Sequence, residues 1–380
     1  MGFFIATFTA MQPDLKYLIA LEMVPMVGSV TAKKLIAFCG SAEAVFSESK
    51  KNLRRIPGVG EAIAAAVARQ NVLHKAEEEL VFTEKNGITI HTYLDGSYPN
   101  RLKQCEDSPL ILYQKGGANL NAERLLSIVG TRKATPYGVA CCEQLVEQLK
   151  VSGHNPIIVS GLAYGIDVCA HKAALKYGLT TVGVMATGLN TVYPAQHRSV
   201  ARQMEEQGGA LVSDFPSSAK LDRNSFLKRN RIIAGLADAT VIVESGEKGG
   251  ALVTADIAMS YSRDVLAFPG RVNDSQSKGC NGLIKRNKAA LIESIEDLEY
   301  ALGWDRQVTK PPIQLPLFGN LSNEEQRIVA ALSECEVETI DNLYRKTEIP
   351  VAKLSSMLLS LEFSGYVRSL PGKSFGLKIK

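Results

Sequence analysis

The segment RNSFLKRNRIIAGL, residues 223–236, decides how we interpret the rest of this chain. In a helix, Phe226, Arg229 and Asn230 share one face, because residues three and four positions apart lie one above the other. An aromatic ring and a fork of hydrogen-bond donors then point the same way, an arrangement that suits a nucleic-acid strand. Ser225 is the expected N-cap of this helix. The alternative is an ordinary amphipathic helix with a buried ring and a solvated basic face.

The composition is that of a soluble globular protein with two or three domains. The chain has 380 residues, of which 46% are hydrophobic and 22% are charged, and a single core seldom extends beyond about 300 residues. The net charge of +4 is too small to predict a polyanionic partner by itself. The basic residues are instead clustered, with five at 220–231 and five at 271–288, so a nucleic-acid partner is argued from these clusters.

Cysteine usage and hydropathy indicate a compartment. The seven cysteines are scattered and form no CxxC pair, which favours reduced thiols over a disulfide framework. The apolar opening MGFFIATFTAM has no basic region before it and no cleavage site, and nothing later approaches about 18 consecutive apolar residues. We therefore expect a cytoplasmic protein with no signal peptide and no membrane contact. Translation from Met1 and from Met11 fits the sequence equally.

Residues 12–80 are expected to form a small helical domain of the helix-hairpin-helix or SAM-like kind. It contains an internal repeat, in which VPMVGSVTAKKLI at 24–36 aligns with IPGVGEAIAAAVA at 56–68. Each copy predicts a tight turn that opens a helix, and in a helix-hairpin-helix motif the backbone N–H groups there can hold a phosphate. Two uses of this domain remain open, a DNA clamp and a packing or partner module.

Six short apolar runs alternate with helix-length segments between residues 121 and 304. They lie at 127–130, 157–160, 180–186, 210–213, 240–244 and 264–268. Unbroken apolar strands separated by helices predict an α/β domain, a Rossmann-like, doubly wound parallel sheet buried on both faces. Residues 88–115, which Pro99 and Pro109 interrupt, are expected to form a connector into this domain. We assign residues 81–305 to the domain with its N-terminal extension.

The carboxyl ends of these strands are rich in glycine and small polar residues. Ligands of doubly wound sheets bind beyond those ends, where this chain carries GTR (130–132), SGLAYGID (160–167) and ESGEKGGA (244–251). None of the turns is a GxGxxG, and no acidic residue follows the second strand in the setting that would hold a ribose. We therefore expect neither a dinucleotide nor another cofactor.

The C-terminal part predicts a linker and a winged helix. Residues 306–319 contain several prolines, as linkers do. Residues 320–380 then predict three helices and a hairpin, with 351–363 in the recognition position and 371–372 at the tip of the wing. From residue 318 onward the chain carries eight basic and eight acidic residues. Because DNA binding needs a basic surface, this balance favours protein contact over DNA contact.

Several of these motifs together resemble the DprA/Smf family of DNA-processing proteins. The matching stretches are GTR at 130–132, SGLAYGID at 160–167, the Asn190–Tyr193–Pro194 stretch, FLKRNRIIAGL at 226–236, ESGEKGGALVTA at 244–255, AFPG at 267–270 and GCNGLI at 279–284. The resemblance implies a protein without enzymatic activity that binds and protects single-stranded DNA and loads a RecA-type recombinase during natural transformation. It also implies a homodimer through the Rossmann-like domain, for which 259–262 and 283–291 are candidate apolar surfaces.

The resemblance further implies which residues contact DNA. Arg132 looks like the family's phosphate-binding arginine, and Phe226, Arg229 and Asn230 belong to its F-x-x-R-N-R signature. Arg223 stands where the family commonly has a lysine, a change that keeps the charge and alters the geometry. The complete set of expected DNA-binding residues is Arg132, Gly161, Arg223, Phe226, Lys228, Arg229, Asn230, Arg231, Lys278 and Asn281.

An enzymatic interpretation is the alternative. GGALVTA at 249–255 superficially resembles the glycine-rich turn of Rossmann-like nucleotide phosphoribohydrolases, which cleave an N-glycosidic bond with an arginine and a glutamate. The carboxylate expected after that turn would have to be Asp256, which lies within a predicted apolar helix and has no paired acid. Asp167, Cys169 and His171 offer only an Asp–His pair on one helix face, so we expect neither catalytic residues nor a metal site.

Overall fold

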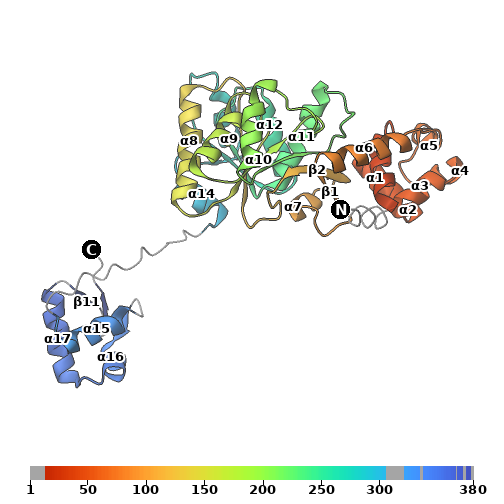
Figure 1. The fold of residues 1–380 in the computed structure, drawn as a ribbon. Coiled ribbons are helices and arrows are strands. Elements are labelled where there is room, and N and C mark those ends of the chain that lie inside the picture. The colour runs from red at the N-terminus through yellow and green to blue at the C-terminus, as the bar shows by residue number, and fades with distance from the viewer. Residues whose placement is uncertain (1–12, 305–320, 334–336, 365, 371–373, 378–380) are drawn as a thin grey trace. The chain divides into compact units, whose positions relative to one another are not determined.

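The computed structural model describes residues 13–304, 321–333, 337–364, 366–370 and 374–377. The chain forms two compact units, Met1–Val308 and Thr309–Lys380 (Figure 1). The first unit contains the N-terminal helices and the large sheet, and the second contains the winged helix. No helix in the described ranges is both long enough and apolar enough to cross a membrane.

Six helices within residues 13–85 pack around a shared core. They are α1 (Pro13–Met23), α2 (Ser29–Cys39), α3 (Ala42–Ser47), α4 (Lys50–Leu53), α5 (Glu61–Ala68) and α6 (Leu73–Lys85). Their apolar side chains form one cluster with Leu110, Ile111 and Tyr113, the last two from strand β2 (Ile111–Gly116). The helical region and the sheet therefore share a continuous core.

The two copies of the repeat have the same local geometry. Met26 and Gly58 both have positive φ, 67° and 86°, and Gly28 and Gly60 are the N-caps of α2 and α5. The predicted turns that open helices are thus confirmed in both copies. In the first copy the side chain at the turn is an exposed methionine, which hinders the close approach of a DNA backbone to the helix N-terminus.

Nine strands of the first unit form one sheet, in the order β1-β2-β6-β5-β4-β3-β7-β8-β9. Besides β2, they are β1 (Thr89–Thr92), β3 (Leu125–Val129), β4 (Ile157–Ser160), β5 (Thr181–Val184), β6 (Ala210–Ser213), β7 (Ala239–Ile242), β8 (Asp264–Ala267) and β9 (Ala290–Leu291). From β6 to β9 along this order all pairs are parallel, and Leu126 of β3 lies opposite Ala239 of β7. Each of the six predicted apolar runs contributes one of these strands, so the predicted doubly wound parallel sheet is confirmed.

Residues 88–115 are more than the connector that their prolines suggested. β1 pairs antiparallel with β2, and β2 pairs antiparallel with β6, so this segment extends the sheet by two strands. Pro99 and Pro109 both fall between the two strands, where no ladder hydrogen bond is needed, and Pro99 is the N-cap of the short helix α7 (Asn100–Lys103).

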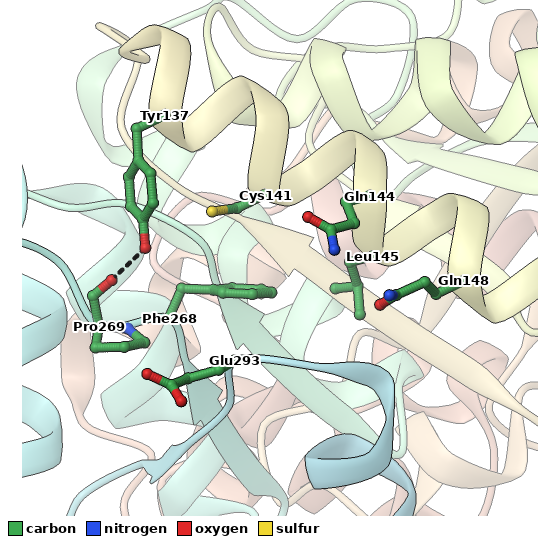
Figure 2. Close-up of a pocket in the computed structure, with 8 residues that line it drawn as sticks. All are labelled: Tyr137, Cys141, Gln144, Leu145, Gln148, Phe268, Pro269 and Glu293. Atoms are coloured by element: carbon green, nitrogen blue, oxygen red, sulfur yellow. Dashed lines mark hydrogen bonds between the residues drawn. The ribbon is translucent and has the colours of Figure 1, made fainter.

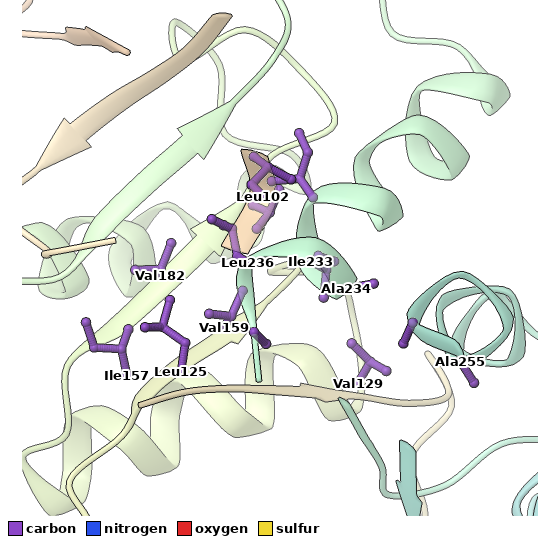
Figure 3. Close-up of a cluster of buried hydrophobic side chains, with 14 of the residues drawn as sticks. Leu102, Leu125, Val129, Ile157, Val159, Val182, Ile233, Ala234, Leu236 and Ala255 are labelled. Atoms are coloured by element: carbon purple, nitrogen blue, oxygen red, sulfur yellow. The ribbon is translucent and has the colours of Figure 1, made fainter. Parts of the chain in front are cut away.

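Helices cover both faces of the sheet. One face packs against α8 (Pro136–Val151), α9 (Ile166–Tyr177), α10 (Arg198–Glu206), which follows a 3-10 turn (Ala195–His197), and α14 (Ile295–Leu302). The other face packs against α7, α11 (Arg223–Leu236), α12 (Gly250–Ser260) and α13 (Lys278–Lys285). Figure 3 shows this second interface, where Ile233 and Leu236 of α11 lie in one cluster with Val129, Val159 and Val182 of the strands.

The sheet order places α11 across the middle of the sheet. α11 connects β6 with β7, and β7 lies on the far side of β3, so α11 packs over β3, β4 and β5. β3 and β7 are also the neighbours between which the direction of winding reverses. In open α/β sheets, the crevice at the carboxyl ends near such a reversal is where ligands bind.

The second unit is a winged helix, as predicted. Its elements are α15 (Asn323–Ser333), β10 (Glu338–Thr339), α16 (Ile340–Thr347), α17 (Val351–Phe363), β11 (Val367–Leu370) and β12 (Ser374–Leu377), with the strands in the order β10-β12-β11. α17 occupies the predicted recognition position. Residues 371–372 at the expected tip of the wing and the expected linker 306–319 lie outside the described residues.

Candidate nucleic-acid interface

A pocket lies at the carboxyl edge of the sheet, where the loops after β3, β4 and β5 meet α11. We call it the strand-end pocket. Its lining residues are Arg132, Gly161, Ala163, Tyr164, Ala186, Tyr193, Pro194, Phe226 and Arg229. Four of the ten residues expected to contact DNA belong to this set, and the structure brings them together from three separate segments of the chain: Arg132, Gly161, Phe226 and Arg229.

The start of α11 is fixed by Asp222. Its carboxylate accepts a hydrogen bond from the backbone N–H of Ser225 at 2.8 Å, and the backbone N–H of Asp222 donates to the Ser225 hydroxyl at 3.3 Å. The prediction that Ser225 is the N-cap is therefore wrong, because Ser225 takes the third helical position of a capping box. This capping box fixes where α11 begins, and Phe226 and Arg229, three and six residues after Arg223, then both face the pocket.

The ring of Phe226 stands between a guanidinium and a second ring. Cζ of Arg132 lies 5.1 Å from the ring centroid, and the ring of Tyr193 lies 5.8 Å away at an interplanar angle of 60°. The Phe226 side chain is half-buried and belongs to none of the apolar clusters that the described residues form. Phe226 is thus part of a pocket wall that presents aromatic surface, rather than part of the core.

Arg229 is a buried cation with few partners. It is only 4% exposed, its Nη1 donates to the carbonyl of Val184 at 3.3 Å, and Nη1 lies 3.9 Å from Oδ2 of Asp167. Its buried Nε has no hydrogen-bond partner within the described residues, and burial lowers the pKa of the guanidinium. An anion entering the pocket would supply hydrogen-bond acceptors for the guanidinium of Arg229 and a negative charge to balance its positive charge.

Asp167 is the buried carboxylate next to Arg229, and it is not itself among the lining residues of the pocket. Burial raises the pKa of its carboxyl above the usual range, while Arg229 and the backbone N–H groups of Ala163, Gly130 and Gly161 act in the opposite direction. The carboxylate therefore ties the turns after β3 and β4 together. Because the ion pair is long and both partners are desolvated, Asp167 offsets only part of the charge of Arg229.

Arg231 and Asn230 do not line the strand-end pocket, although both are next to Arg229. Arg231 donates to the carbonyl of Asp107 and, at 2.7 Å, to Oδ2 of Asp214, and its side chain is mostly buried. Asn230 is buried, with its Nδ2 at 3.5 Å from the carbonyl of Gly250 on α12. Both side chains hold α11 in place.

The remaining expected residues whose side chains the structure describes are not among those that line the pocket. Lys228 is exposed on α11, and Lys278 is exposed at the start of α13. Both amide atoms of Asn281 are bonded to Gly270, with Oδ1 accepting from its N–H at 3.0 Å and Nδ2 donating to its carbonyl at 2.9 Å, which is a structural role. The side chain of Arg223 lies outside the described residues.

The structure adds aromatic residues that the expected set did not contain. Tyr164 and Tyr193 both line the strand-end pocket. The Tyr164 hydroxyl donates to Gln196 at 2.9 Å, and its ring meets that of His197 edge-on at 5.1 Å, so its position is fixed. The sequence did offer a signal for both residues. Each tyrosine follows a predicted strand by a few positions and lies close to a glycine at the end of that strand, where ligands of such sheets bind.

Glu244 and Asp256 have structural partners, and His171 is buried. Glu244, at the end of β7, is buried and accepts hydrogen bonds from the N–H and hydroxyl of Thr135, the N-cap of α8. Asp256 is exposed and pairs with Lys288 at 2.9 Å. Burial lowers the pKa of His171 to about 3. In the described part of the chain, no three His, Cys, Asp or Glu residues are grouped to hold a metal ion.

A second pocket, of about 210 Å³, lies between α8 and the segments after β8 and β9. Figure 2 shows its lining, which consists of Tyr137, Cys141, Gln144, Leu145, Gln148, Phe268, Pro269 and Glu293. The Tyr137 hydroxyl donates to the carbonyl of Pro269 at 2.6 Å and closes one end. None of the expected DNA-binding residues lines this second pocket.

The comparison with known proteins agrees with this arrangement of motifs. The family model described as DNA recombination-mediator protein A matches residues 89–303, and the DprA winged helix domain matches residues 314–373. The chain is 34% identical over 278 residues to Protein Smf of Escherichia coli (strain K12), which covers 72% of this chain and 74% of that protein.

Two solved structures have the same fold. The X-ray structure of DNA processing protein A from Streptococcus pneumoniae superposes with a TM-score of 0.63 at 28% identity, covering 75% of this chain and 97% of that one. DNA processing protein A from Helicobacter pylori, described with its single-stranded DNA binding mode, superposes with a TM-score of 0.50 at 29% identity, covering 57% of this chain and 95% of that one. Because the first family model alone matches more than half of the chain, we conclude that this chain belongs to the DprA/Smf family of DNA-processing proteins.

Proposed function

We propose that this chain binds single-stranded DNA in the strand-end pocket during natural transformation, and that it acts as a binding protein rather than an enzyme. One observation carries the proposal: the Phe226 ring contacts Arg132 and the tilted ring of Tyr193 in a pocket that Arg229, a buried cation with few partners, also lines. The single-stranded DNA binding of the Helicobacter pylori relative supports it.

The aromatic rings that line the pocket favour a single strand over a duplex. A base can insert beside the rings of Phe226 and Tyr193 only if it is unpaired and unstacked. The adjacent phosphates can then reach Arg132 at the rim and Arg229 inside. In a duplex the bases are already stacked on one another, so that only the phosphate contacts would remain.

We further propose that the bound strand is protected and then passed to a RecA-type recombinase. Protection is tested by digesting labelled single strands with a nuclease with and without the chain, and we expect slower digestion when it is bound. Loading is tested by following recombinase filaments on DNA covered by a single-strand-binding protein. We expect faster assembly with this chain, and equal rates would contradict loading.

We also propose a homodimer through the Rossmann-like domain, because two linked pockets would hold a long strand far more tightly than one. Of the apolar surfaces expected for it, Leu283 is buried, and the Tyr261 hydroxyl is bonded to Asp107. Leu291 remains 45% exposed on the edge strand β9. Light scattering should give about twice the 41.1 kDa mass of one chain, and Leu291→Glu should lower it; a monomer at high concentration would contradict the dimer.

The enzymatic alternative has a direct test. If the chain were a nucleotide phosphoribohydrolase, incubation with nucleoside monophosphates would release free base. We expect none, because Asp256 is exposed, pairs with Lys288 and is not among the lining residues of the strand-end pocket.

A further inference from the structure

Glu79 on α6 is a buried carboxylate, only 4% exposed. Among the described residues no cation pairs with it. The hydrogen bonds that its carboxylate accepts come from one residue of the sheet domain, Ser217. The Ser217 backbone N–H lies 2.9 Å from both carboxylate oxygens, and the Ser217 hydroxyl donates to Oε2 at 2.5 Å. Because burying a carboxylate is costly unless its oxygens accept hydrogen bonds, this contact ties α6 firmly to Ser217.

Ser217 joins two loops of the sheet domain. It belongs to the loop 214–222, between β6 and α11, and its carbonyl accepts a hydrogen bond from Nδ2 of Asn190 at 3.0 Å, in the loop 185–194 after β5. The two loops are packed backbone to backbone. A Cβ at Gly188 would come within 2.5 Å of the carbonyl oxygen of Pro216, so position 188 accepts only glycine without movement of the other loop.

These two loops carry one side of the strand-end pocket. The loop 185–194 contributes the ring of Tyr193, and the loop 214–222 ends at Asp222, the cap that sets the position of Phe226. The rings of Tyr193 and Phe226 lie 5.8 Å apart. Leu189, in the loop 185–194, also packs against the core of the N-terminal helices.

We propose that Glu79 is a positioning residue for DNA binding: by holding Ser217, it sets the distance between the Tyr193 and Phe226 rings from outside the sheet domain. The proposal rests on the proposed binding of single-stranded DNA in the strand-end pocket. It gives the N-terminal helices a role in binding without direct contact between them and DNA.

The test uses the full chain and a fluorescently labelled thymidine oligonucleotide, with affinity measured by anisotropy. Glu79→Gln keeps the shape of the side chain but leaves one neutral acceptor oxygen where Ser217 now donates to two charged ones, and we expect an affinity loss of about tenfold. Ser217→Ala and Asn190→Ala break the same connection at two other points and should each lose about threefold. The matched control is Glu84→Gln, an exposed glutamate on the same helix, which should bind like the wild type.

A double-mutant cycle separates positioning from general damage to the fold. In a Tyr193→Ala background, the ring that Glu79 positions is gone, so Glu79→Gln should cost clearly less than it does in the wild type. Equal losses in the two backgrounds would overturn the proposal. Should Glu79→Gln fail to fold, the cycle is run with Asn190→Ala, which breaks the same connection. A smaller loss in the Tyr193→Ala background again supports positioning, and an equal loss overturns it.

The outcomes also separate this proposal from the function on which it rests. If the wild type does not bind the oligonucleotide, the proposed function itself fails. If the wild type binds and Glu79→Gln binds as tightly as the Glu84→Gln control, the positioning role of Glu79 is overturned while the function stands.

Discussion

The guanidinium of Arg229 fills the space above Gly161. A Cβ at position 161 would overlap Nη1 of Arg229 and come within 2.7 Å of Oδ2 of Asp167. Gly161 directly follows β4, so the absence of a side chain there lets a cation from α11 lie over the end of the strand. This pairing explains why a glycine and an arginine that are far apart in the sequence belong to one site.

Gly161→Ala should therefore weaken single-stranded DNA binding by about tenfold or more, because the added methyl group displaces a guanidinium whose hydrogen bonds to a phosphate contribute about 1.5–3 kcal/mol. Anisotropy titration measures the loss, and circular dichroism verifies the fold. Gly96→Ala is the control, because a Cβ there meets nothing within 4 Å. Wild-type affinity in Gly161→Ala would show that Arg229 does not need this space to bind DNA.

Phe226→Ala should cost about 1–3 kcal/mol of DNA affinity and leave the melting temperature nearly unchanged, because the ring lines a pocket and is not part of the core. Ile233→Ala on the same helix gives the opposite result, since Ile233 is 1% exposed in the core. It should lose about 2–5 kcal/mol of folding stability. Calorimetry and anisotropy on both variants check the contrast, and a large drop in melting temperature for Phe226→Ala would place its ring in the core.

Arg231→Ala should destabilise the fold and leave the intrinsic DNA affinity close to that of the wild type. Its removal leaves the carboxylate of Asp214 buried without its cation, which costs about 3–5 kcal/mol. Urea unfolding measures the stability, and binding is measured at a temperature at which the variant is folded. If Arg231→Ala lost affinity as strongly as an Arg229 variant while keeping its stability, Arg231 would be a DNA ligand after all.

Glu22 should make stability depend on pH. Burial, followed by the charge of Asp214, raises the pKa of this carboxyl from 4.5 to about 8. The folded state therefore binds a proton that the unfolded state releases, so this contribution is complete below pH 4.5 and is lost as the pH rises toward 8. The slope is at most about 1.4 kcal/mol per pH unit. Glu22→Gln should remove it, and parallel stability curves for the two proteins between pH 5 and pH 8 would contradict this.

The helical face of residues 223–236 was predictable, because spacing alone places Phe226 and Arg229 together. The sequence could not show which side of α11 faces the sheet, so Arg231 was expected in the site with Arg229. Its partners Asp107 and Asp214 come from other loops, and no local pattern connects them with α11. The N-cap was predicted at Ser225 and is Asp222 in the structure for a related reason. Both residue types cap helices well, and the spacing of apolar residues does not fix where the first turn begins.

Six of the seven parallel strands were predictable, because strands buried on both faces leave unbroken apolar runs. β1 was missed because it is half-exposed at the sheet edge, and its sequence, Thr89–Thr92, carries no such run. Glu79 could not be distinguished from Glu77 and Glu78, since a glutamate in an amphipathic helix is usually solvated. Its role depends on a serine 138 residues away.

The most direct test of the strand-end pocket compares a single strand with its duplex at two salt concentrations. We predict tighter binding of the single strand, with log affinity falling by about 0.7 per unit of log salt for each phosphate neutralised, and a slope smaller by about that amount in Arg132→Ala. Equal affinity for the two forms of DNA, with an Arg132→Ala slope like that of the wild type, would contradict the account.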